Sequence, residues 1–221
     1  MDDSTKDNIE PTPSKALQLV RRILNQAIDG VAPLSSASDL AEEYLIDQSY
    51  DDRDERVDAV IRWEAAKNFT SGFLTGLGGV VTLPVTIPSA LGASWIIQAR
   101  MCGAIAAIYG HSLQEDRVRT LVLLAVIGDS GKEILKELGI RIGRRVTAAA
   151  IDRIPGRVLV EINKRVGFRL LTKAGERGLV NFAKIVPVVG GVVGGSFDAT
   201  MCVGVGKTAK RIFRTEKQSD A

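Results

Sequence analysis

The sequence predicts an all-α fold: a single helical domain with a glycine-rich apolar central hairpin and a flexible N-terminal arm. Three observations favour this class. Apolar residues recur at helical spacing through most of the chain, and neither an Asn-Gly hairpin nor a regular strand alternation with turn spacing is present. The chain also has 22 glycines and only 5 % aromatic residues, so its helices are expected to pack through small and aliphatic side chains. We expect an arm over residues 1–13, one domain over 14–214 and a flexible tail over 215–221.

Three amphipathic helices are expected in the N-terminal third. Ser14 can cap the first, and Gly30 closes it. The second is expected over residues 38–48, and the third follows the acidic turn at residues 51–52. The apolar spacing of the second and third helices predicts their buried positions, which are Leu40, Tyr44, Leu45, Val57, Val60, Ile61 and Trp63.

Residues 68–99 form a run of 32 residues without a charged side chain. An uncharged run longer than about 18 residues is typical of a membrane span, but Pro84, Pro88 and several glycines argue against one straight helix of ordinary stability. Pro88 is well placed to begin a helix, because its fixed φ suits the first helical position. We expect that helix over residues 88–109, ended by Gly110 in a left-handed conformation.

Two S-x-x-E motifs predict the starts of the next two helices. The motifs are Ser112–Glu115 and Ser130–Glu133, and in each the serine and the glutamate can satisfy exposed backbone donors in a capping box. We expect the first helix to reach Ile127. The second should continue to Ala149, with apolar residues along one face.

The C-terminal part of the chain is expected to hold two further helices. Residues 158–171 alternate partly as a strand would, but their length and the charges on the opposite face favour a helix. Its buried positions are expected to be Leu159, Ile162, Val166 and Leu170. The last long element should begin near Pro187 and end in the basic stretch 207–214.

Charge is distributed unevenly, although the net charge is only +3. Residues 1–64 carry a net charge of −8, whereas residues 132–184 carry +8. We expect these segments to neutralise each other across a folded interface. The alternative is that the basic segment faces anionic lipid or nucleic acid, but no nucleic-acid partner is expected.

Three short matches to catalytic motifs lack the context that their chemistry needs. Gly204–Thr208 resembles the end of a phosphate-binding loop, but Met201 stands where that motif requires glycine. Gly128–Gly131 resembles the nucleophile region of a chymotrypsin-like protease, whose many strands this chain lacks. His111 is the only histidine, which excludes a histidine-rich metal site. We therefore assign no catalytic, cofactor-binding or metal-binding residue, while an enzyme that uses carboxylates alone stays open.

The two cysteines, Cys102 and Cys202, lie in apolar glycine-rich segments. We expect both to be free and buried, as small hydrophobic residues. The acidic N-terminus, residues 1–10, lacks the basic region and apolar core of a secretory signal. A cytoplasmic location follows, which is compatible with contact with the inner face of the membrane.

Arg100 and Asp198 are each the lone charge inside a long apolar segment. Because an isolated buried charge is very costly, such groups normally pair. We expect Arg100 to meet Asp198, or alternatively Asp129, in a buried ion pair. Otherwise each of these side chains points to solvent from a polar edge.

Glycines four residues apart line single helical faces and allow another helix to approach closely, as in membrane helix pairs. Gly103 continues the pattern on the helix between the two glycine-rich segments. Small-residue seams also occur in water-soluble helical proteins, so the sequence leaves open whether they face protein or lipid. The helix-packing or membrane-facing positions are Gly72, Gly76, Gly79, Pro84, Pro88, Gly190, Gly191, Gly194 and Gly195.

Three blocks of sequence carry a family resemblance. They are Thr70–Gly79 with Thr82–Pro84, Arg100 with Ile108–Leu113, and Lys184–Gly191 continuing to Phe197–Asp198. In these blocks the chain resembles the bacterial EcsC family, named for a protein encoded beside an ABC transporter. The resemblance covers roughly residues 60–214 and leaves the acidic N-terminal third unplaced. It implies an all-α bacterial protein near the membrane and supplies no catalytic residues.

Together these features predict a non-enzymatic protein that associates with the cytoplasmic membrane or a membrane complex. The contact would be peripheral or made through a helical hairpin, with residues 69–110 and 185–206 as the expected elements. The basic side chains expected near anionic headgroups are Arg141, Arg144, Arg145, Lys207, Lys210, Arg211 and Arg214. The alternative is a soluble helical module that binds a lipid or other apolar ligand in its core.

Overall fold

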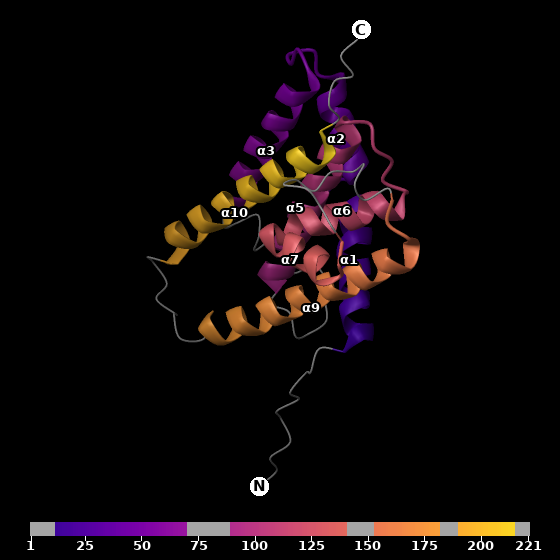
Figure 1. Cartoon of the computed structure of the whole chain (residues 1–221). Helices are drawn as coiled ribbons and strands as arrows, with labels where there is room; N and C mark the ends of the chain where they lie inside the picture. Colours follow the sequence, from indigo (N-terminus) through magenta and orange to yellow (C-terminus); the bar gives the residue numbers. More distant parts are fainter. Residues whose placement is uncertain (1–11, 70–88, 141–152, 182–189, 215–221) are drawn as a thin grey trace.

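The computed structural model describes residues 12–69, 89–140, 153–181 and 190–214. Within these ranges the backbone forms eight α-helices and no β-strand, as Figure 1 shows, which confirms the predicted all-α class. The helices are α1 (Pro13–Ile28), α2 (Ala37–Ile46), α3 (Arg53–Phe69), α5 (Ser89–Ile108), α6 (Asp116–Ile127), α7 (Asp129–Glu137), α9 (Gly156–Asn181) and α10 (Gly190–Phe213).

Helix α5 forms the centre of the molecule. Every residue from 92 to 106 is buried, and α1, α2, α3, α6 and α10 all pack against it. A helix that is apolar on all sides belongs either in a protein core or in a membrane. Here the described part of the uncharged run lies in the core. None of the described helices combines the length and the hydropathy that a membrane crossing requires.

Glycines set two of the helix crossings that enclose this core. A Cβ atom at Gly167 of α9 would lie 2.3 Å from the backbone oxygen of Ala16 in α1, so only glycine permits this approach. At Gly206 of α10 a Cβ would lie 2.7 Å from the side chain of Ile61 in α3. Figure 1 shows α9 crossing α1 in this way and α10 lying beside α3.

Gly103 of α5 shows what the predicted small-residue seam contacts. A Cβ added at this position would lie 2.9 Å from the Cβ of Ala37, the first residue of α2. The described part of the seam therefore faces another helix of the same chain. The predicted glycine and proline positions within residues 70–88 lie outside the described residues, as do the surroundings of the glycines at 190–195.

The N-terminal helices begin close to where the sequence places them. Thr12 caps α1, whose first residue is Pro13, rather than the predicted Ser14. Helix α2 begins with a complete capping box, in which the Ser36 hydroxyl accepts from the backbone N–H of Asp39 and the Asp39 carboxylate accepts from that of Ser36. Gly110 ends α5 with a φ of +91°, which confirms the left-handed cap.

Both predicted S-x-x-E capping boxes are wrong. Helix α6 begins at Asp116 behind Glu115, and α7 begins at Asp129 behind Gly128, without a side-chain cap in either case. The Ser112 hydroxyl instead accepts from the backbone N–H of Gln114, within the turn. Helix α7 ends at Glu137 instead of continuing to residue 149, because Gly139 adopts a φ of +69°.

The predicted buried faces are mostly confirmed. The expected inward positions of α9 are all buried, as are those of α2 and α3 apart from Leu45 and Trp63. Leu45 is 45 % exposed and Trp63 is 54 % exposed, so these two predictions are wrong. Trp63 follows the buried Ile61 by two positions, which at about 100° per residue places it on the opposite side of the helix.

Candidate functional site

Arg100 is buried at the centre of the helical bundle and bonds to two other elements. Its Nη1 donates to Oε2 of Glu64 in α3 at 3.1 Å. Its Nε donates to the backbone oxygen of Ser35 at 2.6 Å, and Nη2 donates to the Ser35 hydroxyl at 2.7 Å. Arg100 thereby ties α5 to α3 and to the turn before α2.

Glu64 is the carboxylate partner that the sequence interpretation missed. The prediction that Asp129 could pair with Arg100 is wrong, because the Asp129 side chain is 92 % exposed and pairs with Lys132 at 3.0 Å. The side chain of Asp198, the other predicted partner, lies outside the described residues. A signal for Glu64 was present, because it follows the buried residues Val57, Val60 and Ile61 at helical spacing and so belongs to the buried face of α3.

Tyr44 of α2 lies in the electrostatic field of this ion pair. Burial raises the pKa of its hydroxyl from 10.0 to about 12, and the negative charge of Glu64 adds to the shift. Its ring also lies 6.1 Å from that of Tyr50. The cluster of Arg100, Glu64, Ser35 and Tyr44 therefore joins α2, α3 and α5 inside the molecule, and its hydrogen-bond geometry explains how a charged side chain is accommodated in α5.

A second polar cluster joins the start of α3 to the end of α10. Lys210 donates to the Asp58 carboxylate at 2.7 Å and to the backbone oxygen of Asp54 at 3.3 Å. Arg214 pairs with the Asp54 carboxylate at 2.5 Å, and the hydroxyl of Tyr109 donates to the same carboxylate at 2.6 Å. Burial, followed by this hydrogen bond, raises the pKa of Tyr109. These contacts show that α3 and α10 run antiparallel.

His111 has a structural contact at the same end of the molecule. Its Nε2 lies 2.9 Å from the backbone oxygen of Phe213, the last residue of α10, and the two rings are 5.4 Å apart. The carbonyl groups at a helix C-terminus lack partners within the helix, so this contact satisfies one of them. His111 thus secures the end of α10 to the turn after α5.

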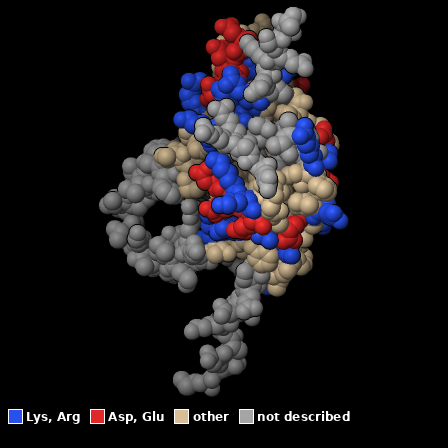
Figure 2. All heavy atoms as spheres, viewed as in Figure 1, with Lys and Arg blue, Asp and Glu red and all other residues tan. Residues whose placement is uncertain are grey.

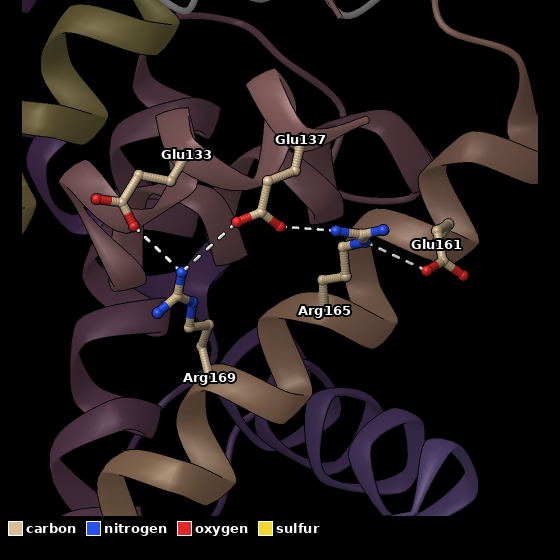
Figure 3. A network of polar contacts seen from close by, with 5 residues as sticks. All are labelled: Glu133, Glu137, Glu161, Arg165 and Arg169. Carbon is tan, nitrogen blue, oxygen red and sulfur yellow. Dashed lines mark hydrogen bonds and ion pairs between the residues drawn. The ribbon is translucent and has the colours of Figure 1, made fainter. Parts of the chain in front are cut away.

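A third polar cluster links α7 to α9, as Figure 3 shows. Arg165 donates to Glu137 at 2.7 Å and to Glu161 at 3.3 Å. Arg169 contacts Glu133 at 3.2 Å and Glu137 at 3.8 Å. The five side chains are half-exposed, so the network holds two surface helices together.

These pairs correct the expected charge neutralisation. Among the described residues, Asp54 and Asp58 of the N-terminal third pair with the end of α10, and Glu64 pairs with Arg100. The ion pairs found for Arg165 and Arg169 lie within the 132–184 segment itself. Charge is therefore balanced locally, between helices that touch, in the part of the chain that the structure describes.

Two of the predicted lipid-contacting residues remain available on the surface. Lys207 and Arg211 lie on the exposed face of α10, and neither forms an ion pair among the described residues. Arg211 donates only to α10 itself, to the backbone oxygen of Lys207 and to the hydroxyl of Thr208. Figure 2 shows basic and acidic side chains interleaved over the part of this face where α3 and α10 lie side by side in Figure 1. Arg141, Arg144 and Arg145 lie outside the described residues.

Neither cysteine forms a disulfide bond and both are buried, as predicted. The thiol of Cys202 lies 3.8 Å from the sulfur of Met101, in the contact between α10 and α5. Burial raises the pKa of the Cys102 thiol, with a smaller contribution from Cys202. Within the described ranges, no group of three His, Cys, Asp or Glu side chains is placed to hold a metal ion.

The described residues define an all-α protein whose central helix is anchored by a buried ion pair and whose C-terminal helix carries an exposed basic face. The chain belongs to the EcsC protein family, whose model matches residues 6–215. The match includes the acidic N-terminal third, so the predicted limit of the resemblance at about residue 60 is wrong. No curated protein and no solved structure matches the chain.

Proposed function

We propose that this protein is a non-enzymatic bacterial protein of the cytoplasm that associates with the inner face of the cell membrane, or with a complex in that membrane, through the basic face of α10. The observation that carries the proposal is that Lys207 and Arg211 are exposed and form no ion pair among the described residues. Each basic side chain close to an anionic membrane surface contributes about 1 kcal/mol to binding.

The sequence around this face supports the same proposal. Residues 185–206, which lead into the basic stretch, contain Asp198 as their only charged residue. A basic stretch next to an apolar segment is typical of chains that contact the boundary between headgroups and hydrocarbon. Because α3 and α10 are antiparallel, the last residues of α3 lie at the end of the molecule at which α10 begins.

The burial of α5 narrows the proposed contact surface. The sequence interpretation included this helix, within residues 69–110, among the membrane-associating elements. Its residues 92–106 are enclosed by five other helices and contact protein. We therefore assign the proposed contact to the outer face of α10 rather than to α5.

Cell fractionation tests the proposal. Membranes from bacterial cells that express the chain are washed with low salt, high salt or alkaline carbonate, and the chain is followed by immunoblotting. A peripheral association predicts retention at low salt and release by high salt, since salt screens the attraction to anionic headgroups. Retention after carbonate would indicate an inserted hairpin instead.

A second measurement separates the proposal from its alternative. Recovery of all the protein in the soluble fraction would reject membrane association. Mass spectrometry of the purified protein then decides whether a lipid has co-purified. A stoichiometric lipid in soluble protein would support a module that encloses an apolar ligand.

A further inference from the structure

The basic residues at the end of α10 fall into two groups with different surroundings. Lys207 and Arg211 are exposed and form no ion pair among the described residues, although Lys132 and, to a smaller extent, Arg211 lower the pKa of the Asp129 carboxyl. Lys210 and Arg214, by contrast, pair with Asp58 and Asp54 of α3. Residues 207–214 span about 10 Å of helix at a rise of about 1.5 Å per residue, which is close to the Debye length of about 10 Å at 0.1 M salt. All four cations therefore act on the same region of an approaching surface.

We infer that the end of α10 is a contact surface for anionic phospholipid that Asp54 and Asp58 partly mask. Lys207 and Arg211 bind the lipid first, whereas Lys210 and Arg214 bind it only after they leave these two carboxylates. This inference rests on the proposed membrane association. It specifies anionic phospholipid as the ligand and two aspartates as the groups that limit its binding. The four basic side chains fit phosphate groups, because their N–H donors match phosphate oxygens. A lipid phosphate can replace the carboxylate of Asp58 as the partner of Lys210.

The two carboxylates differ in how much the folded structure depends on them. Asp54 accepts from Tyr109 as well as from Arg214, at 2.6 and 2.5 Å, and its side chain is 27 % exposed, so it also holds α5 to α3. Asp58 is 61 % exposed, and its contact is with Lys210, whose own side chain is 19 % exposed. Asp58 is therefore the carboxylate that restrains a cation without supporting the core.

The test uses Asp58→Asn, which keeps the shape of the side chain and removes its charge. Glu42→Gln is the matched control, since Glu42 is exposed on α2 and forms no ion pair in the described part of the chain. Both variants raise the net charge by one unit. The double variant Asp58→Asn/Lys210→Gln also removes the positive charge of Lys210, which Asp58→Asn alone would release. Circular dichroism verifies that each variant is folded.

Binding is measured by co-sedimentation with vesicles of phosphatidylglycerol and phosphatidylcholine, and with vesicles of phosphatidylcholine alone, at about 0.1 M salt. We expect Asp58→Asn to bind the anionic vesicles about fivefold more tightly, which corresponds to about 1 kcal/mol for one added basic side chain at the surface. Glu42→Gln should change binding less than about twofold, because it adds the same unit of net charge without releasing a basic side chain from an ion pair. The double variant should return to the wild-type affinity.

Equal affinities of Asp58→Asn and Glu42→Gln would overturn the masking inference and leave membrane association standing. A double variant as tight as Asp58→Asn would also overturn it, because the gain would then not come from Lys210. Wild-type protein that fails to bind anionic vesicles would reject the proposed function, and the inference with it. Binding that is unchanged in Lys207→Gln/Arg211→Gln would show that the free pair is not the first contact.

Discussion

Replacement of Arg100 by methionine probes the buried ion pair, the most consequential polar contact in the described core. Methionine fills much of the space of the arginine stem but forms none of the three hydrogen bonds that Arg100 donates to described residues. Two of those bonds go to Ser35, an exposed residue whose hydroxyl and backbone oxygen can bond to water instead. The third goes to Glu64, whose residue exposure is 0 %. The loss is therefore dominated by a buried carboxylate deprived of its arginine.

The expected size of the effect follows from this difference. Removal of one member of a buried ion pair costs about 3–5 kcal/mol, whereas an ordinary hydrogen bond contributes about 0.5–1.5 kcal/mol. We expect Arg100→Met and Glu64→Gln each to lower the free energy of unfolding by about 3–5 kcal/mol. Since most domains are stable by about 5–15 kcal/mol, a change of this size is readily measured. Ser35→Ala should lose about 1 kcal/mol or less.

Urea unfolding followed by circular dichroism provides the measurement, and the double variant Arg100→Met/Glu64→Leu provides the decisive comparison. Replacing both residues with apolar groups removes both charges of this pair, so the double variant should be more stable than either single variant. Two results would refute the reasoning: an Arg100→Met loss no larger than that of Ser35→Ala, or a double variant destabilised by the sum of the two single losses.

Three further predictions concern packing, thiol burial and pH. Gly167→Ala should destabilise the protein by at least about 1–3 kcal/mol, whereas Gly204→Ala, with no atom within 4 Å of the added methyl group, should stabilise it by up to about 1 kcal/mol; thermal unfolding compares the two. Cys102 and Cys202 should react with a thiol reagent only slowly until urea is added, and rapid native labelling would contradict their burial. The pKa of Tyr44 is raised from 10.0 to about 12, so the folded state keeps this proton to a higher pH than the unfolded chain does. The free energy of unfolding should therefore fall as pH rises from about 10 toward 12. It should fall less steeply in Tyr44→Phe, and an equal slope in the two proteins would contradict this prediction.

The elements that depend on local sequence were the most predictable. The limits of α5 follow from Pro88 and Gly110, because proline favours a first helical turn and glycine adopts the positive φ of a helix end. The buried face of α9 follows from the spacing of its apolar residues, whose period is fixed by the helix itself. Trp63 was mispredicted because its apolar character was weighed without its angular position on α3.

Contacts between distant segments were predicted less well. The motif Ser130–Glu133 has the residues of a capping box, but the backbone enters α7 two residues earlier, at Gly128, and the motif lies inside the helix. The cost of an isolated buried charge correctly indicated that Arg100 would have a buried partner. The choice of Glu64 depended on how α3 lies against α5, which neither segment encodes alone.

The sequence by itself determined the helical class, the family resemblance, the position of the central apolar helix and the need for a counter-ion to Arg100. Only the tertiary structure decided that α5 contacts protein and that Glu64 is that counter-ion. It also decided that, among the described residues, Lys210 and Arg214 form ion pairs whereas Lys207 and Arg211 do not. The physical reason is that the spacing of apolar residues shows which helix face is buried away from water, but not whether protein or lipid buries it. Contacts between helices that are remote in sequence determine which segment packs on each apolar face and which residue pairs with each charge.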